Sequence, residues 1–227
     1  MKPSTIAIDG PAASGKSTIG YHLARYLSYL YLDTGVLYRA VTWAALDRRI
    51  PIEDEAAITQ LSQDLDIEVT ASAEDDGRQY TVRSEGRDIT WAIRTAEVDR
   101  AVSPVSAYPG VREALTRRMR EIAAQGRVVM VGRDIGTVVI PDADMKLYVI
   151  ASAEERARRR HREIVAQGKA ARYEDVLAGI QRRDKIDSSR KAAPLKAAPD
   201  AVIFDNTDLT IEKMLQEVDK LIHNCKR

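Results

Sequence analysis

Hydrophobic positions follow two different periods that alternate along most of the chain. A short apolar and β-branched run from Thr5 to Ile8 predicts a strand. Ile19, Leu23 and Leu27 then recur at the spacing of one helix face. Strands separated by helices in this way indicate an α/β fold with a parallel sheet covered on both faces.

The same alternation predicts further elements up to the end of the sequence. Ser152 and Glu155 are spaced as a capping box, which predicts a helix start directly after an apolar strand. The further strands are expected at Tyr29–Leu32, Val128–Val131, Lys146–Ile150 and Ala201–Phe204, and two further helices at Val36–Asp47 and Ile211–Ile222.

One region departs from this alternation of strands and helices. Between Ile67 and Ile89 the apolar residues alternate with polar ones, as they do in a half-buried strand. Glycines at 77 and 86 each follow an acidic residue, which is typical of tight turns. We therefore expect a small antiparallel insert in this part of the chain.

The junction between the first strand and the first helix reads GPAASGKS. Gly10, Gly15, Lys16 and Ser17 fit the pattern G-x-x-x-x-G-K-[ST], in which backbone N–H groups and a helix N-terminus converge on phosphate oxygens. Lys16 is expected to reach the outer phosphates, and the Ser17 hydroxyl to ligate magnesium. The sequence therefore predicts a binding site for a nucleoside triphosphate.

Composition narrows the class of protein. The chain has 227 residues, 44% hydrophobic and 30% charged, which suits one globular domain. Thirty-five basic residues against 34 acidic ones argue against a nucleic-acid-binding surface. The only cysteine, Cys225, rules out a disulfide within the chain, so we expect a cytoplasmic protein. No apolar run approaches the roughly 20 residues of a membrane span, so no membrane partner is expected.

Two common classes of phosphate-loop protein fit the sequence poorly. A signalling GTPase needs D-x-x-G and N-K-x-D motifs, and neither occurs. A motor ATPase needs a strand of four apolar residues followed by aspartate. Asp33 and Asp205 both satisfy that pattern, and a pattern that matches twice discriminates little, because buried strands commonly end at a polar residue.

The arginines point to phosphate chemistry. The chain has 25 arginines against 10 lysines, and arginine can grip phosphate oxygens through two parallel N–H bonds. Arg39 and Arg133 follow the carboxyl ends of predicted strands, where ligands bind in open α/β sheets. Arg183 and Arg190 lie where helix periodicity gives way to polar residues and proline. Most of the five arginines between positions 156 and 162 are instead expected on a solvated helix face, interleaved with glutamates.

Five segments occur along the chain in a definite order. They read GPAASGKST, LDTGVLYRA, VSPVSAYPGVREAL, VGRDIGTVVIPDA and RRDKIDSSRKAAPL. Together they resemble the bacterial cytidylate kinase family, and the likeness extends from about Thr5 to Ile222. The phosphate loop is only one of the five segments, so the resemblance is specific.

The resemblance implies a P-loop NTPase core like that of adenylate kinase, with five parallel strands, a lid, and a β-rich insert in the region that binds the monophosphate. It implies a single domain over 1–227, with the core at about 1–35, 100–153 and 199–227. The monophosphate-binding region would span about 36–99, with its insert at about 66–90, and the lid with its flanking helices about 154–190.

The resemblance also implies transfer of the γ-phosphoryl group of ATP to CMP or dCMP, with Mg²⁺, by a monomer. The implied catalytic residues are Lys16, Arg39, Arg133, Arg183 and Arg190. The implied ATP site is Gly10, Pro11, Ala12, Ala13, Ser14, Gly15, Lys16, Ser17 and Thr18, with Ser17 as the metal ligand. The implied monophosphate site is Thr34, Arg39, Ser103, Arg112, Arg133, Asp134, Asp187 and Arg190.

In the family pattern three of these residues read the base and one meets the sugar. Asp134 would accept from the exocyclic amine of cytosine, while Arg112 and Ser103 would meet N3 and O2. Asp187 would meet the ribose hydroxyls. Two alternatives stay open at this point: a kinase for another nucleoside monophosphate such as UMP, and a protein whose P-loop senses a nucleotide.

Overall fold

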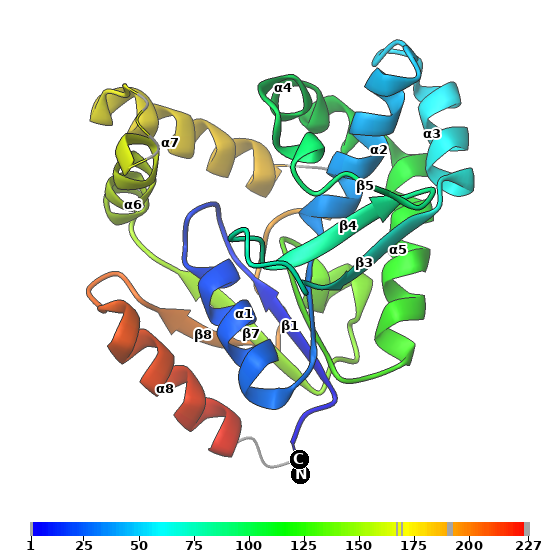
Figure 1. Ribbon diagram of the computed structural model, residues 1–227. Helices are drawn as coiled ribbons and strands as arrows, with labels where there is room; N and C mark the ends of the chain where they lie inside the picture. The colour runs from blue at the N-terminus through cyan, green and yellow to red at the C-terminus, as the bar shows by residue number, and fades with distance from the viewer. Residues whose placement is uncertain (1, 167, 169, 190–192, 225–227) are drawn as a thin grey trace. The chain divides into compact units, whose positions relative to one another are not determined.

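The computed structural model describes residues 2–166, 168, 170–189 and 193–224 (Figure 1). The chain divides into two compact units. One comprises Met1–Tyr29 and Arg127–Arg227, and the other Leu30–Gly126. No helix among the described residues is both long enough and apolar enough to cross a bilayer.

A five-stranded sheet has the strand order β2-β6-β1-β7-β8. Strand β1 is parallel to β6 on one side and to β7 on the other, and β8 is parallel to β7. Ile6 and Ile8 of β1 are fully buried, as expected for a strand in the middle of a covered sheet. The strands are β1 (Thr5–Asp9), β2 (Leu30–Asp33), β6 (Val128–Gly132), β7 (Met145–Ile150) and β8 (Val202–Asp205).

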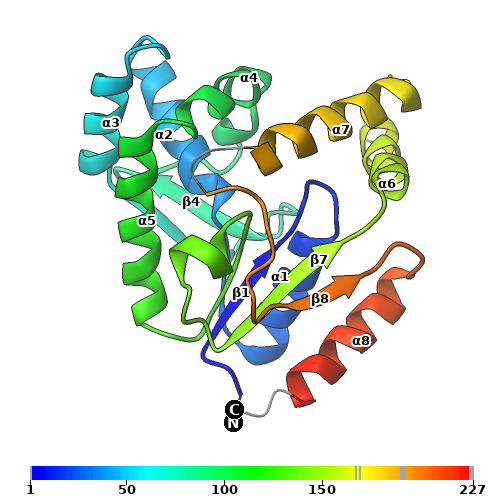
Figure 2. The same cartoon turned by 180° about the vertical axis from the view of Figure 1, so that it is seen from behind.

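The helices of the first unit fall into two pairs. Helices α1 and α8 lie side by side on one face of the sheet (Figures 1 and 2), where His22 of α1 bonds Asp219 of α8 at 3.0 Å. Helices α6 and α7 pack against each other. The bounds are α1 (Lys16–Leu27), α6 (Ala153–Ala166), α7 (Tyr173–Ser189) and α8 (Ile211–Asn224), with a π-helical turn, η2, at Ile135–Val139.

The second unit contains the predicted insert. Its three strands pair in the order β3-β4-β5, all antiparallel, with Val69 opposite Val82. Gly77 and Gly86 adopt positive φ angles of 84° and 78° in the turns between the strands, which favours glycine there. The other elements are α2 (Gly35–Asp47), α3 (Glu55–Asp64), η1 (Ala92–Arg94), α4 (Ala96–Val105) and α5 (Pro109–Ala124), and the strands are β3 (Ile67–Ala71), β4 (Tyr80–Ser84) and β5 (Arg87–Asp88).

The α/β class, the five parallel strands and the antiparallel insert are confirmed, with strand ends within about one residue of those expected. The capping box is only half correct. The Glu155 N–H donates to Ser152 Oγ at 3.2 Å, but the Ser152 N–H bonds Thr207 instead of the glutamate. Helix α7 also continues through Ser189, beyond the point where the apolar periodicity ends.

Candidate functional site

The phosphate loop can be built only with glycine at its first position. Gly10 follows β1 with a φ of 148°, and a Cβ atom there would lie 2.1 Å from the carbonyl oxygen of Val149. Gly15, with a φ of 92°, has equally little room, because a Cβ would lie 2.8 Å from Asn206 Nδ2. Ala13 between them is also left-handed, with a φ of 57°. The loop therefore bends tightly from the end of β1 into α1.

Helix α1 starts at Lys16; its N-cap residue, Gly15, supplies no side-chain cap, and its first turn carries no acidic residue. Such a terminus favours an anion, since the helix dipole and the N-terminal N–H groups act together. Lys16 is buried, and its Nζ donates to the carbonyl of Pro11 at 2.7 Å across the loop. The ammonium group is thus held over the loop in which a phosphate would sit.

The donor set also fits magnesium. Ser17 in the first turn of α1 is half-buried and offers a hydroxyl oxygen, a hard ligand of the kind that Mg²⁺ accepts. Among the described residues, no group of three or more His, Cys, Asp or Glu side chains is arranged to hold a metal.

Asp9 ties the end of β1 to the turn that carries two candidate site residues. Its Oδ1 accepts the N–H of Ile135 at 2.8 Å, and its Oδ2 accepts the N–H of Gly136 at 2.7 Å. These N–H groups directly follow Arg133 and Asp134, so the buried carboxylate fixes the turn that presents both side chains. Asp9 was not among the predicted site residues, although a polar residue at the end of an apolar strand was a usable signal.

Asp9 carries a pH prediction. Burial, its largest influence, raises the pKa of this carboxyl group from 3.8 to about 6, and the charge of Asp134 adds to the rise, while the two N–H bonds and Lys16 oppose it. The folded chain therefore keeps a proton that the unfolded chain releases. Stability from this group is complete below about pH 4 and is lost as the pH rises through about 6.

We expect the free energy of unfolding of the wild type, relative to that of Asp9→Asn, to fall by about 2 kcal/mol between pH 4 and pH 7. Urea unfolding followed by circular dichroism at several pH values measures this difference. Asp142→Asn, which removes an exposed carboxylate, is the matched control. If the difference in free energy of unfolding between the wild type and Asp9→Asn stays constant with pH, the prediction is wrong.

The first unit brings four of the predicted site residues close together. Arg133 Nε donates to Asp187 Oδ2 at 3.1 Å, and Arg183 Nε lies 3.9 Å from the same oxygen. Asp187 is only 2% exposed, whereas the side chain of Arg183 is 63% exposed. Asp134 is buried at the start of η2, close enough to influence Asp9. Arg190 lies outside the described residues.

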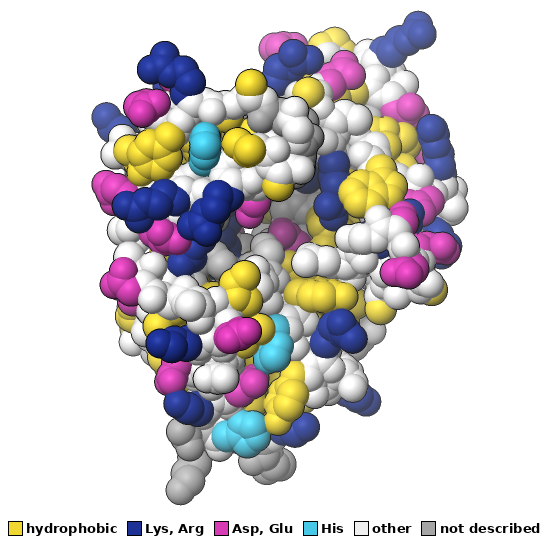
Figure 3. All heavy atoms as spheres, turned by 60° about the vertical axis from the view of Figure 1, so that its left-hand side comes forward, with side chains coloured by type: hydrophobic (Ala, Val, Ile, Leu, Met, Phe, Trp, Pro, Cys, Tyr) yellow, Lys and Arg dark blue, Asp and Glu magenta, His cyan; other side chains and the backbone are white. Residues whose placement is uncertain are grey.

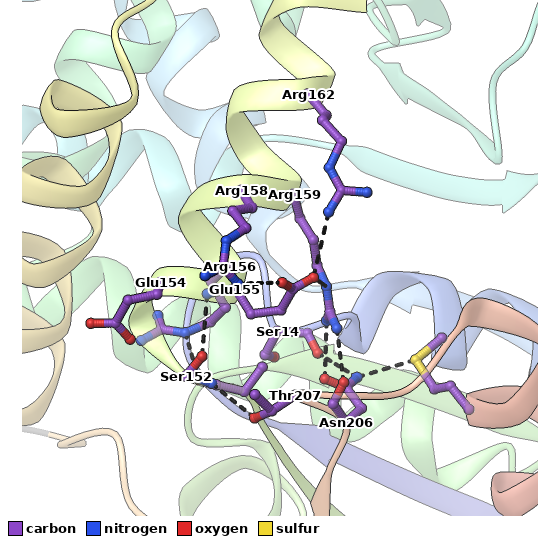
Figure 4. A network of polar contacts seen from close by, with 12 residues as sticks. Ser14, Ser152, Glu154, Glu155, Arg156, Arg158, Arg159, Arg162, Asn206 and Thr207 are labelled. Atoms are coloured by element: carbon purple, nitrogen blue, oxygen red, sulfur yellow. Dashed lines mark hydrogen bonds and ion pairs between the residues drawn. The ribbon is translucent and has the colours of Figure 1, made fainter.

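Arg156 has a different environment from the other arginines of α6. Its side chain is 5% exposed, and it makes two N–H bonds of 2.9 and 2.6 Å to the Asp184 carboxylate. It also donates to the carbonyl of Ala12 in the phosphate loop at 3.3 Å. Figure 4 shows Arg156 beside Ser152 and Glu155 at the start of α6. Arg156 therefore connects the phosphate loop, α6 and α7.

Three neighbouring arginines do form a solvated face, as expected. Arg158, Arg160 and Arg162 are exposed. They pair with glutamates of the same helix, Glu155 and Glu163, at 3.0 to 3.6 Å. Figure 3 shows the same mixture of basic and acidic side chains on this side of the molecule. Exposed pairs of this kind contribute little to stability.

The second unit holds the other predicted residues of the monophosphate site. Arg39 of α2 is anchored from two sides, by the carbonyl of Ile93 at 3.0 Å and by the carboxylate of Asp99 at 2.6 Å. Thr34 is buried immediately before α2, where its carbonyl accepts the N–H of Leu37. The anchors of Arg39 come from η1 and α4, so both elements orient its guanidinium group.

Arg112 and Ser103 lie on α5 and α4 of this unit. Arg112 donates to the carbonyl of Ser106 at 3.3 Å, and its guanidinium carbon lies 5.8 Å from the ring centre of Tyr38. Ser103 is exposed, and its carbonyl accepts from the Ser106 hydroxyl at 2.9 Å. Ser106, in the turn after α4, thus bonds the backbone of one candidate residue and the side chain of the other.

The family model for cytidylate kinase matches residues 6–224. A cytidylate kinase of Bacillus licheniformis is 49% identical over 223 residues, which cover 96% of this chain and 97% of the relative. One from Herpetosiphon aurantiacus is 49% identical over 220 residues, covering 97% and 94%. The alignments therefore cover nearly the whole length of this chain and of each relative.

Solved structures agree on the fold alone. The crystal structure of TT1252 from Thermus thermophilus aligns over the full length of both chains with a TM-score of 0.51 at 18% identity. A structure of an uncharacterized protein from Eubacterium ventriosum aligns over 97% of this chain and 98% of its own with a TM-score of 0.52 at 11% identity. At these identities the structural similarity supports the fold and says nothing about the reaction, which has to be argued from the site residues.

Proposed function

The chain belongs to the cytidylate kinase family, and we propose that it transfers the γ-phosphoryl group of ATP to CMP or dCMP, giving CDP or dCDP and ADP. The observation that carries this proposal is the match to cytidylate kinases over nearly the whole chain. A phosphate loop with a buried lysine supports the donor half of the reaction.

Phosphoryl transfer needs positioning and charge stabilisation more than proton transfer. Lys16 would stabilise charge on the transferring group, while the loop from Gly10 to Thr18 would hold ATP through its N–H groups. Ser17 would hold Mg²⁺, which would supply further positive charge to the phosphates. The acceptor phosphate and the transferring group would be clamped by arginine, and the proposed residues are Arg39, Arg133, Arg183 and Arg190.

Arg133 and Asp187 would act as a pair. The guanidinium group of Arg133 donates to the carboxylate of Asp187 at 3.1 Å. This bond restricts the Arg133 side chain before substrate arrives, so less conformational entropy would be lost when Arg133 binds phosphate. Asp187 would also meet a ribose hydroxyl. A site that positions its arginines before the substrate arrives spends less binding energy on ordering them.

Recognition of cytosine is proposed to depend on Asp134, Arg112 and Ser103. Cytosine offers an amine where uracil offers a carbonyl, and an N3 acceptor where uracil offers an N–H. UMP would therefore face Asp134 with an acceptor and Arg112 with a donor. Buried charges left unpaired in this way would discriminate by roughly 10³-fold or more.

We further propose the organisation that the family implies. Residues of about 36–99, with Thr34 before them, would contribute to the monophosphate site, and those of about 154–190 would form the lid with its flanking helices. The substrates would be small molecules, with no nucleic acid and no membrane involved. The protein would be a cytoplasmic monomer acting in pyrimidine nucleotide metabolism.

A coupled assay of ADP release with CMP, dCMP, UMP, AMP and GMP tests the function. We expect kcat/KM for CMP and dCMP to exceed the other three by at least about 100-fold. Comparable turnover of UMP would instead identify a kinase of broader or different base choice. ATP binding without ADP release on any monophosphate would support a nucleotide sensor and overturn the proposal.

A further inference from the structure

Asn206 joins three parts of the first unit through one fully buried carboxamide (Figure 4). Its Nδ2 donates to the carbonyl of Ser14 in the phosphate loop at 2.8 Å. Its Oδ1 accepts from Arg159 of α6 at 3.0 Å, and its Nδ2 also lies 3.1 Å from the sulfur of Met214 in α8. Asn206 directly follows β8, and its backbone N–H donates to the carbonyl of Ile150 at the end of β7 at 3.0 Å.

The orientation of this carboxamide follows from its partners. A guanidinium group can only donate hydrogen bonds, and a carbonyl can only accept them. Turning the amide over would place N–H against the N–H of Arg159, and oxygen against the oxygen of Ser14. The bond to Arg159 therefore determines that Nδ2 faces the phosphate loop.

The bond to Ser14 has a consequence for the next residue. In a planar trans peptide, the carbonyl of Ser14 and the N–H of Gly15 point in opposite directions. Holding the carbonyl toward Asn206 therefore aims the Gly15 N–H away from it. Asn206 Nδ2 also lies 2.8 Å from where a Cβ of Gly15 would be, so the carboxamide supports the loop directly.

Arg159 is itself held from two directions. Its NH2 atom donates to the backbone carbonyl of Asn206 at 2.8 Å, and its Nε to Glu155 at 3.1 Å on the same helix. The guanidinium group thus bonds both the side chain and the main chain of one residue. Helix α6 and the phosphate loop are coupled through that residue.

We propose that Asn206 is a positioning residue for ATP: its carboxamide, oriented by Arg159, sets the Ser14–Gly15 peptide of the phosphate loop so that the N–H faces the phosphates. This inference rests on the proposed function for the identity of the donor nucleotide. Loss of the carboxamide should leave the loop free to turn this peptide, which weakens phosphate binding without touching the acceptor side.

The test compares Asn206→Ala and Asn206→Asp with the wild type. Asn206→Ala removes the side-chain bonds to Ser14 and Arg159 and the contact with the Met214 sulfur. Asn206→Asp keeps an acceptor for Arg159 and places a second oxygen against the carbonyl of Ser14. We expect both variants to bind a non-hydrolysable ATP analogue roughly tenfold more weakly by titration calorimetry, the effect of losing one buried hydrogen bond. KM for ATP should rise in parallel, and KM for CMP should stay within about twofold.

Two further variants separate positioning from general destabilisation. Val218→Ala removes a buried contact of α8 that makes no bond to the loop, and it should lower the melting temperature without changing ATP affinity. Arg159→Ala should weaken ATP binding by itself, but add little in the Asn206→Ala background.

Wild-type affinity in both Asn206 variants, or equal weakening in Val218→Ala, would overturn the inference. Additive effects of Asn206→Ala and Arg159→Ala would overturn the part assigned to Arg159. A wild-type protein without activity on CMP would instead contradict the proposed function.

Discussion

Replacing Lys16 by alanine should lower kcat with CMP and ATP by at least about 100-fold, because the substitution removes the buried positive charge that is proposed to stabilise the transferring phosphoryl group. The ammonium group is already fixed by the carbonyl of Pro11 at 2.7 Å, so little ordering is needed when ATP binds. Steady-state kinetics with both substrates varied would measure the loss.

The fold should survive this substitution. Lys16 lies at the first position of α1, where alanine is a good helix former, and the apolar face of the helix, including Ile19 and Leu23, stays unchanged. Circular dichroism and the melting temperature would verify this. Lys213→Ala, on the exposed side of α8, controls for the loss of one positive charge. Near-normal turnover by a folded Lys16→Ala protein would remove Lys16 from the proposed role.

Local patterns were sufficient to predict most of the fold. Strand β6 is a run of four apolar residues, and α1 has apolar residues at regular helical spacing, so each element is specified by its own sequence. The antiparallel insert was predictable for the same reason, since its turns contain glycines at positive φ. The end of α7 was not predictable from apolar spacing, because its last turns, from Arg182 to Ser189, contain one apolar residue, Ile186.

The partners of the site residues could not be predicted from local patterns. Arg156 and Arg158 are two positions apart in an arginine-rich helix, yet only Arg156 is buried. The carboxylate that Arg156 bonds belongs to Asp184, 28 residues further along the chain. Asn206 reaches Ser14 across 192 positions. Such pairs exist only after the strands have brought their carboxyl ends to one edge of the sheet. Motifs therefore identify candidate residues, while burial and pairing distinguish among them.

Asp134→Asn should lower kcat/KM for CMP by a factor that corresponds to about 1–3 kcal/mol, since the proposed charge-assisted bond to the cytosine amine would become a neutral one. The amide can turn its NH₂ group toward the O4 of uracil, so discrimination against UMP should relax. Arg112 would still oppose the N3–H of uracil, so the switch should be incomplete. The measurement is kcat/KM for CMP and for UMP in the wild type and the variant.

ATP affinity separates a change in base recognition from damage to the whole site. Asp134 is buried at the start of η2 and is proposed to act on the acceptor, so the dissociation constant for ATP should change little in Asp134→Asn. Asp142→Asn removes an exposed carboxylate close by in the sequence and should leave both nucleotides unaffected. If the ratio of kcat/KM for CMP to that for UMP is the same in Asp134→Asn as in the wild type, Asp134 does not read the base. The choice among monophosphate kinases would then depend on Arg112 and Ser103, and the same ratio measured in Arg112→Met would be the next discriminating result.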